Sequence, residues 1–169
     1  MTHFRFFHAL TIGLTLALAL PARAEIAPPQ LGEVSLAQPL PLPFAERADP
    51  HAELDAALAR ARISGKRVLI DLGGNWCGDC RVFAAILALP AVRKFVDGHF
   101  ELVAIDVGRF DRNLDIPARF GIAKLVAAPT ILILSPAGEL LNGDDLVALQ
   151  DARSMTPQAV VDWLAHWAV

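Results

Sequence analysis

The sequence of 169 residues has few of the groups that mark metal sites or nucleic-acid-binding surfaces. It holds only two cysteines, and His51, His99 and His166 are scattered without the spacing of metal ligands. Basic residues do not outnumber acidic ones, and the formal net charge is −3, so we expect no nucleic-acid partner. Apolar residues nevertheless make up 54% of the chain, which is enough for a folded core and argues against disorder.

The sequence also lacks a hydrophobic run long enough to cross a membrane. The apolar stretch near its start, Ala9–Leu20, has twelve residues, whereas a helix needs about 20 to span the hydrocarbon core. Arg5 precedes this stretch, and Ala22-Arg23-Ala24 has the small-x-small pattern of a cleavage site. We therefore predict that residues 1–24 are a secretory signal peptide and that the mature protein is not stably inserted in a membrane.

Export would set the charge and the redox environment of the mature chain. Cleavage removes Arg5 and Arg23, so the 15 basic residues fall to 13 against 18 acidic residues, a net charge of −5. The protein would be periplasmic in a Gram-negative source and secreted otherwise. Disulfides form and persist in both places.

The two cysteines lie close together in the segment Trp76-Cys77-Gly78-Asp79-Cys80-Arg81. An apolar run, Val68–Ile70, and a glycine-containing loop precede them. This order predicts a turn from a strand into a helix, with the first sulfur at the helix N-terminus, where free N–H groups and the helix dipole favour a thiolate. A ring of four residues would add only about 2 kcal/mol of stability, against roughly 3–5 for long loops. The pair is therefore better explained as a working disulfide than as a structural staple.

The rest of the chain alternates predicted helices and strands, and contains no internal repeat. Asp49-Pro50 and Thr156-Pro157 each combine an N-cap residue with a proline at the first helical position. The predicted elements are a helix over 50–64, a strand over 67–72, helices over 77–88 and 91–97, a strand over 100–106, a short helix over 117–120, a strand over 130–134 that pairs with 139–141 as a hairpin, and a helix from 157. The nearly apolar strand 100–106 is predicted to be central and buried. This order indicates an α/β domain whose mixed sheet is covered by helices on both faces.

A proline-rich segment, residues 25–48, precedes the predicted domain. The run Pro39-Leu40-Pro41-Leu42-Pro43 cannot be helical and favours an extended path. Its leucines and Phe44 are consistent with packing on the domain surface. A free tether is the alternative that the sequence leaves open.

The chain from Asp49 to Ala168 resembles the thioredoxin family. Four landmarks occur in the family's order: a strand ending in Asp71, the Trp76-Cys77-Gly78-x-Cys80 motif, Arg119-Phe120-Gly121-Ile122, and Ala128-Pro129-Thr130 where the family has its cis-proline loop. The resemblance implies a thioredoxin-like fold over residues 49–169, with a central mixed sheet of four or five strands.

The resemblance also implies roles at the site. Cys77 would be the partly exposed attacking thiol, Cys80 would resolve the mixed disulfide, and the two would form the Cys77–Cys80 disulfide. Asp71 would be the buried acid that assists proton transfer. The residues implied to contact the substrate are Trp76, Gly78, Asp79, Ala128, Pro129 and Thr130. A cis peptide at Pro129 would turn the backbone of Ala128 toward an extended substrate segment.

Two features depart from the thioredoxin pattern. Asp79 stands where thioredoxin has proline, and its charge should disfavour a thiolate at Cys77, with Arg81 offsetting part of this effect. Extra residues near 107–114 and 123–128 lengthen the path to Pro129, and Leu125-Val126 would widen an apolar rim beside the dithiol.

The sequence therefore predicts an exported thiol:disulfide oxidoreductase that needs no cofactor and acts as a monomer on protein disulfides or thiols. It would be a reductant or a mild exchanger rather than a strong oxidant. It would depend on a redox partner, because no second dithiol is present to recycle the pair. The alternatives are a copper-binding module that uses Cys77 and Cys80 as soft ligands, and a partner-binding domain that kept the fold without catalysis.

Overall fold

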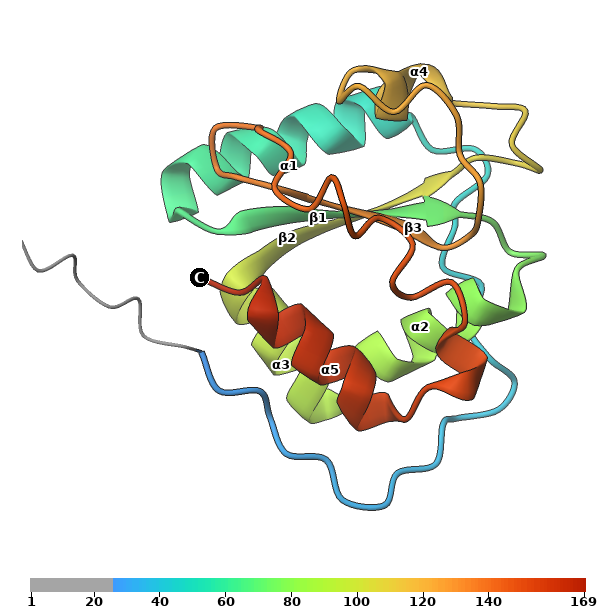
Figure 1. Ribbon diagram of the computed structural model, residues 1–169, viewed down its shortest axis with the longest axis vertical. Coiled ribbons are helices and arrows are strands. Elements are labelled where there is room, and N and C mark those ends of the chain that lie inside the picture. Colours follow the sequence, from blue (N-terminus) through green and yellow to red (C-terminus); the bar gives the residue numbers. More distant parts are fainter. Residues whose placement is uncertain (1–25) are drawn as a thin grey trace, which may run out of the picture.

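The computed structural model describes residues 26–169; the predicted signal peptide lies outside them. The described part of the chain forms a three-stranded sheet in the order β2-β1-β3, with helices on both faces (Figure 1). The strands are β1 (Arg67–Gly73), β2 (Phe100–Asp106) and β3 (Thr130–Leu134). β1 pairs with β2 in parallel and with β3 antiparallel. The mixed sheet covered on both faces is confirmed.

The sheet has fewer strands than the four or five that we predicted. Residues 139–141 return toward β3, but within the described residues they form a single bridge, Leu134 with Leu140, and no strand. The side chain of Asn142 replaces part of the missing ladder, because its Oδ1 accepts from the Ile133 N–H at 2.8 Å and its Nδ2 donates to the Ile131 carbonyl at 2.8 Å. Because the Asn142 side chain already binds these groups of β3, fewer backbone N–H and C=O groups remain for pairing with a fourth strand.

The strand β2 lies at an edge, whereas we predicted it to be central. β1 is the central strand, and all seven of its residues are buried. In β2, Leu102 is 40% exposed. The prediction was wrong because an apolar run shows that the faces of a strand are covered, here by α1 (Pro50–Ser64) and α3 (Pro90–His99). It does not show whether both edges are paired.

The helices fall into two groups, one on each face of the sheet (Figure 1). α1 and the short α4 (Asp115–Ala118) cover one face, and α2 (Gly78–Leu87), α3 and α5 (Pro157–His166) cover the other. Alternate residues of β1 supply the two cores, with Leu69 on the α2 side and Val68, Ile70 and Leu72 on the α1 side. Because side chains alternate along a strand, Asp71 and Gly73 belong to the α2 side.

Local signals explain where the helices begin. Asp49 Oδ1 accepts from the N–H groups of His51 and Ala52 at 3.1 Å each, which caps α1, and Gly65 ends this helix with φ 76°. Thr156 Oγ1 accepts from the Ala159 N–H at 3.2 Å and caps α5. Among residues 26–169, no helix is long and apolar enough to cross a membrane.

The proline-rich segment follows the surface of the domain rather than leaving it as a free tether (Figure 1). Ile26, Leu31 and Leu36 pack against the core on the α2 side of the sheet. The Leu31 N–H donates to Gln158 Oε1 on α5 at 2.7 Å. Residues 26–48 contain no strand, so this segment covers the domain with side chains and does not extend the sheet.

Candidate functional site

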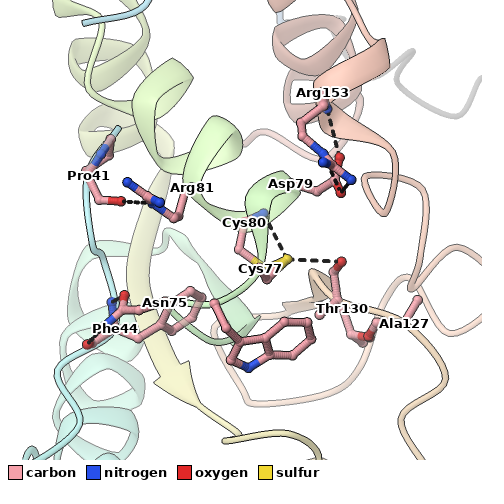
Figure 2. Close-up of a disulfide and its surroundings, with 12 residues drawn as sticks. Pro41, Phe44, Asn75, Cys77, Asp79, Cys80, Arg81, Ala127, Thr130 and Arg153 are labelled. Carbon is pink, nitrogen blue, oxygen red and sulfur yellow. Dashed lines mark hydrogen bonds and ion pairs between the residues drawn. A yellow bond between two sulfur atoms is a disulfide. The ribbon is translucent and has the colours of Figure 1, made fainter. Parts of the chain in front are cut away.

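The two cysteines lie at the N-terminus of α2. Cys77 is the N-cap residue, with an extended backbone at φ −83° and ψ 115°. Its Sγ accepts a hydrogen bond from the Cys80 N–H at 3.1 Å. The two residues form a disulfide with their Cα atoms 5.3 Å apart (Figure 2). The structure thus places the first sulfur where the helix dipole and a backbone N–H can stabilise a thiolate.

Cys77 is less accessible than predicted, whereas Cys80 is buried as expected. Cys77 is 4% exposed and Cys80 is fully buried, so the expectation of a partly exposed Cys77 is wrong for this disulfide form. Three residues from other parts of the chain, Phe44, Ala104 and Ala128, pack with the cysteines in one small cluster. Phe44 comes from the proline-rich segment, which explains why the motif alone did not predict this cover.

The backbone of β1 approaches Cys80 closely at Gly73. A Cβ atom on Gly73 would lie 2.7 Å from Cys80 Sγ and 2.7 Å from Cζ of Phe44. Both contacts are too short for a real side chain. Only glycine therefore lets the strand, the buried sulfur and the Phe44 ring meet at this point.

Polar contacts hold Phe44 in this position. The Asn75 side chain binds both backbone groups of Phe44: its Oδ1 accepts from the Phe44 N–H at 3.1 Å, and its Nδ2 donates to the Phe44 carbonyl at 2.9 Å. Arg81 binds the same segment slightly earlier, with Nη2 2.7 Å from the Leu40 oxygen and Nε 3.1 Å from the Pro41 oxygen (Figure 2). Residues beside both cysteines thus anchor the proline-rich segment.

Asp71 lies on β1, two residues before Gly73 and on the same face of the sheet. Since Cys80 Sγ meets that face at Gly73, the Asp71 carboxyl group points into the layer that holds the buried sulfur. Asp71 is 2% exposed, and its Oδ1 has no hydrogen-bond partner among the described residues. Burial raises the pKa of Asp71 to about 8. A carboxyl group of this kind can exchange a proton near neutral pH.

The loop before β3 faces Cys77. The Ala128–Pro129 peptide bond is cis, as predicted, and the Ala128 carbonyl oxygen lies 3.4 Å from Cys77 Sγ. Thr130 is 2% exposed and its Oγ1 donates to the Ala127 carbonyl at 2.7 Å. Its side chain therefore stabilises the loop, and only its backbone remains as a candidate substrate contact.

Trp76 forms an exposed rim beside the dithiol. It is 44% exposed, and its Nε1 donates to the Gly108 carbonyl at 2.6 Å. The Phe110 ring stands edge-on to it with centroids 6.0 Å apart, and the Arg109 guanidinium lies 5.0 Å from the centroid of the Trp76 ring. The extra residues after β2 thus orient the tryptophan.

The second set of extra residues forms part of an apolar pocket. A cavity of about 190 Å³ lies between the segment 122–125 and the residues Phe110, Leu114 and Pro117. Leu125 is 7% exposed and belongs to the core, whereas Val126 is 76% exposed. Of the two residues predicted to form an apolar rim, Val126 is therefore the exposed one.

Asp79 is paired with a cation that the sequence did not indicate. Its Oδ1 accepts from the Arg153 N–H at 2.9 Å, and its Oδ2 lies 3.0 Å from Nε and 3.0 Å from Nη2 of Arg153 (Figure 2). We predicted that Arg81 would offset the charge of Asp79. The structure assigns that place to Arg153, because the Arg81 guanidinium binds carbonyl groups of the proline-rich segment.

Comparison with known proteins agrees with this geometry. A family model described as thioredoxin-like matches residues 49–136. The chain belongs to the thioredoxin-like family. The match contains β1, both cysteines and the cis-proline loop, and it identifies the chain as a member of a family of disulfide oxidoreductases.

Individual relatives of this thioredoxin-like chain carry related names. A solved disulphide isomerase from Xylella fastidiosa superposes with a TM-score of 0.71 at 33% identity, covering 75% of this chain and 97% of that one. Thioredoxin from Alicyclobacillus acidocaldarius is 30% identical over 47% of this chain and 68% of its own. Thiol:disulfide interchange protein DsbD 1 of Pseudomonas aeruginosa is 38% identical over 52% of this chain. That match spans only 15% of the DsbD protein.

Four residues of the thioredoxin-like site were missed by the sequence reasoning: Gly73, Phe44, Asn75 and Arg153. Gly73 and Asn75 lie just before the motif. A glycine at the end of a buried strand was a usable signal that another group approaches the backbone closely there. Phe44 and Arg153 lie 33 residues before and 76 residues after Cys77, and no local pattern connects them to it. Within residues 26–169, no group of three or more histidine, cysteine or acidic side chains is placed to hold a metal ion.

Proposed function

We propose that this protein is an exported thiol:disulfide oxidoreductase that exchanges disulfides with protein substrates through Cys77 and Cys80. The observation that carries the proposal is Cys77 at the N-cap of α2, joined to Cys80 and facing the Ala128 carbonyl oxygen at 3.4 Å. A thiolate at this position can attack a disulfide sulfur that approaches over the loop.

In the reducing direction, the reaction has two steps. The Cys77 thiolate attacks a substrate disulfide, which forms a mixed disulfide and releases one substrate thiolate that takes up a proton. Cys80 then passes its proton to the Asp71 carboxylate and attacks Cys77 Sγ, and the second substrate thiolate leaves and is protonated. Two electrons pass from the dithiol to the substrate, and the protein ends in the disulfide form. A partner with a lower reduction potential then returns two electrons.

The substrate would lie between Trp76 and the Ala128-Pro129 loop. The backbone of Ala128 can pair with an extended substrate segment in the manner of an added strand, and Gly78 and Asp79 at the helix start are further candidate contacts. Trp76 is 44% exposed, and Val126, two residues before Ala128, is 76% exposed, so apolar side chains are available on both sides of this region. Unfolded or misoxidised protein segments, which expose apolar side chains, fit such a surface.

We further propose that the dithiol is a reductant or a mild exchanger and that the protein acts as a monomer. The carboxylate of Asp79 is balanced by the Arg153 guanidinium, so no net positive charge is added next to Cys77. A strong oxidant requires a strongly stabilised thiolate. We therefore expect a reduction potential closer to about −270 mV than to about −120 mV.

Insulin reduction with dithiothreitol tests the activity. The wild-type protein should accelerate precipitation of the insulin B chain, because each turnover needs a thiolate at Cys77. Cys77→Ser should lose this acceleration. The matched control is Ser64→Ala at the end of α1, which should retain it. Equal rates for the wild type and Cys77→Ser would contradict the proposal.

Export is tested on the full chain. The pattern Ala22-Arg23-Ala24 predicts that the mature protein begins at Glu25. N-terminal sequencing of the protein recovered from the periplasmic fraction of a Gram-negative host should show Glu25 first. Retention of Met1 in the cytoplasmic fraction would contradict export and leave the redox proposal intact.

A further inference from the structure

Asp79, the acid inside the motif, is bound by Arg153, a residue near the other end of the chain. Asp79 is 8% exposed, and the backbone N–H, Nε and Nη2 of Arg153 all contact its carboxylate at 2.9–3.0 Å. Arg153 lies on the short helix η1 (Ala152–Ser154), which packs against α2. Asp79 also raises the pKa of the Arg153 guanidinium. The Asp79 carboxylate is thus bound through both of its oxygens, Oδ1 by the Arg153 backbone N–H and Oδ2 by the guanidinium, although the Arg153 side chain itself is 65% exposed.

The Arg153 side chain also extends over the residue next to Cys77. A Cβ atom on Gly78 would lie 3.2 Å from Cδ and 3.3 Å from both Nε and Nη1 of Arg153. The guanidinium therefore crosses the first turn of α2, where the attacking sulfur is the N-cap. Glycine at position 78 leaves the room that this crossing requires.

The other charged groups around the dithiol are engaged elsewhere. Arg81 binds the carbonyls of Leu40 and Pro41, and Arg109 lies over the Trp76 ring. Asp71 is buried on β1. Asp151, two residues before Arg153, raises the pKa of the Arg153 guanidinium through its charge. Arg81 also belongs to the first turn of α2, but its guanidinium binds the proline-rich segment, which leaves Asp79 and Arg153 as the paired charges of this turn.

We propose that Arg153 is a positioning residue that sets the stability of the Cys77 thiolate by holding and neutralising the carboxylate of Asp79. This inference rests on the proposed dithiol exchange and adds a residue to it. Without Arg153, a negative charge two residues from Cys77 would oppose the thiolate. Without Asp79, the guanidinium would remain as an unbalanced positive charge over the same turn and would favour the thiolate.

The two single variants should therefore shift the pKa of the Cys77 thiol in opposite directions. Arg153→Gln should raise the pKa of the Cys77 thiol, and Asp79→Asn should lower it. Each shift should be about half a unit to one unit, which changes the thiolate fraction below the pKa roughly three- to tenfold. The double variant should return close to the wild type, because neither charge remains. Asp79→Asn should also be the more oxidising protein, since a more stable thiolate favours the reduced form.

The measurement is the rate of iodoacetamide alkylation at Cys77 in the reduced protein as a function of pH, followed by mass spectrometry. Asp151→Asn is the matched control: Asp151 acts on Arg153 through its charge alone, so its removal leaves the contacts between Asp79 and Arg153 in place and should shift the Cys77 pKa little. Reduction potentials against glutathione give a second readout. Thermal unfolding shows whether each variant is folded.

Opposite shifts of the two single variants support the proposal. Shifts in the same direction, or no shift beyond that of Asp151→Asn, would overturn it and leave the pair as a structural contact between η1 and α2. If Arg153→Gln does not fold, the double variant decides: its Cys77 pKa should lie above that of Asp79→Asn, because the Arg153 charge is then absent, and equal values would overturn the proposal. The alkylation rate does not depend on turnover, so a protein without insulin reductase activity would contradict the proposed function and not this inference.

Discussion

Gly73 occupies the point where β1, Cys80 and Phe44 meet. A Cβ atom there would lie 2.7 Å from both the Cys80 sulfur and the Phe44 ring, and both of these groups are buried. Overpacking of a core commonly costs about 1–3 kcal/mol. The close approach at Gly73 therefore predicts that any side chain at this position destabilises the protein.

Gly73→Ala should lower the free energy of unfolding by about 1–3 kcal/mol. Gly98→Ala is the matched control. Gly98 lies in α3 with no atom within 4 Å of an added Cβ, so alanine there should stabilise the protein by up to about 1 kcal/mol through helix propensity. Urea unfolding of the disulfide form measures both. An unchanged midpoint for Gly73→Ala would show that the strand, the sulfur and the ring are less tightly packed than described.

At the scale of elements, the extended segment before α1 supplies part of the site. Phe44 is 2% exposed and packs with both cysteines, and Asn75 and Arg81 hold the backbone of this segment in place. Leu42, two residues earlier, is 65% exposed. The segment therefore contains a buried anchor and an exposed residue of comparable chemistry.

Phe44→Ala should cost about 3–5 kcal/mol of stability, since it empties a buried aromatic site. It should also speed alkylation of Cys80 in the reduced protein, because the ring covers that sulfur. Leu42→Ala should change neither quantity measurably. Chemical denaturation and mass spectrometry of alkylated Cys80 are the two measurements. Equal Cys80 alkylation in both variants would show that Phe44 contributes packing without shielding the sulfur.

At the scale of the whole molecule, the two layers of helices leave Asp71 between the sheet and α2 with no access to water. Burial raises the pKa of Asp71 from its ordinary value of 3.8 to about 8. The folded state therefore binds this proton more tightly than the unfolded state. Stability from this group is fully present below about pH 4 and is lost as the pH rises through about 8.

Asp71→Asn should flatten this dependence. The variant should match the wild type near pH 4 and exceed it increasingly above that, by at most about 1.4 kcal/mol for each pH unit up to pH 8. Asp97→Asn, at an exposed position on α3, is the control. Unfolding free energies measured from pH 4 to pH 9 give the two curves. Parallel curves for the wild type and Asp71→Asn would contradict a raised pKa.

Local patterns predicted much of the site and of the fold. The Cys77–Cys80 pair and the helix that begins after Cys77 were predicted from neighbouring residues and are present. The cis bond before Pro129 was predicted from the resemblance to the thioredoxin family and is also present. The position of β2 and the strand count were predicted wrongly, because an apolar run reports covered faces and not paired edges. The placement of the proline-rich segment was left open, since its docking depends on Asn75 and Arg81 rather than on its own composition.

The sequence by itself determined the dithiol, the element that presents it and the family to which the chain belongs, because each of the motifs involved consists of residues a few positions apart. The tertiary structure alone decided what surrounds the sulfurs. Phe44 packs with Cys80 and Arg153 binds Asp79 although each pair is far apart in the sequence, and contacts between such distant residues follow from how the layers pack. Asp79, which the motif presents as an unbalanced charge beside Cys77, is in the folded protein one half of an ion pair.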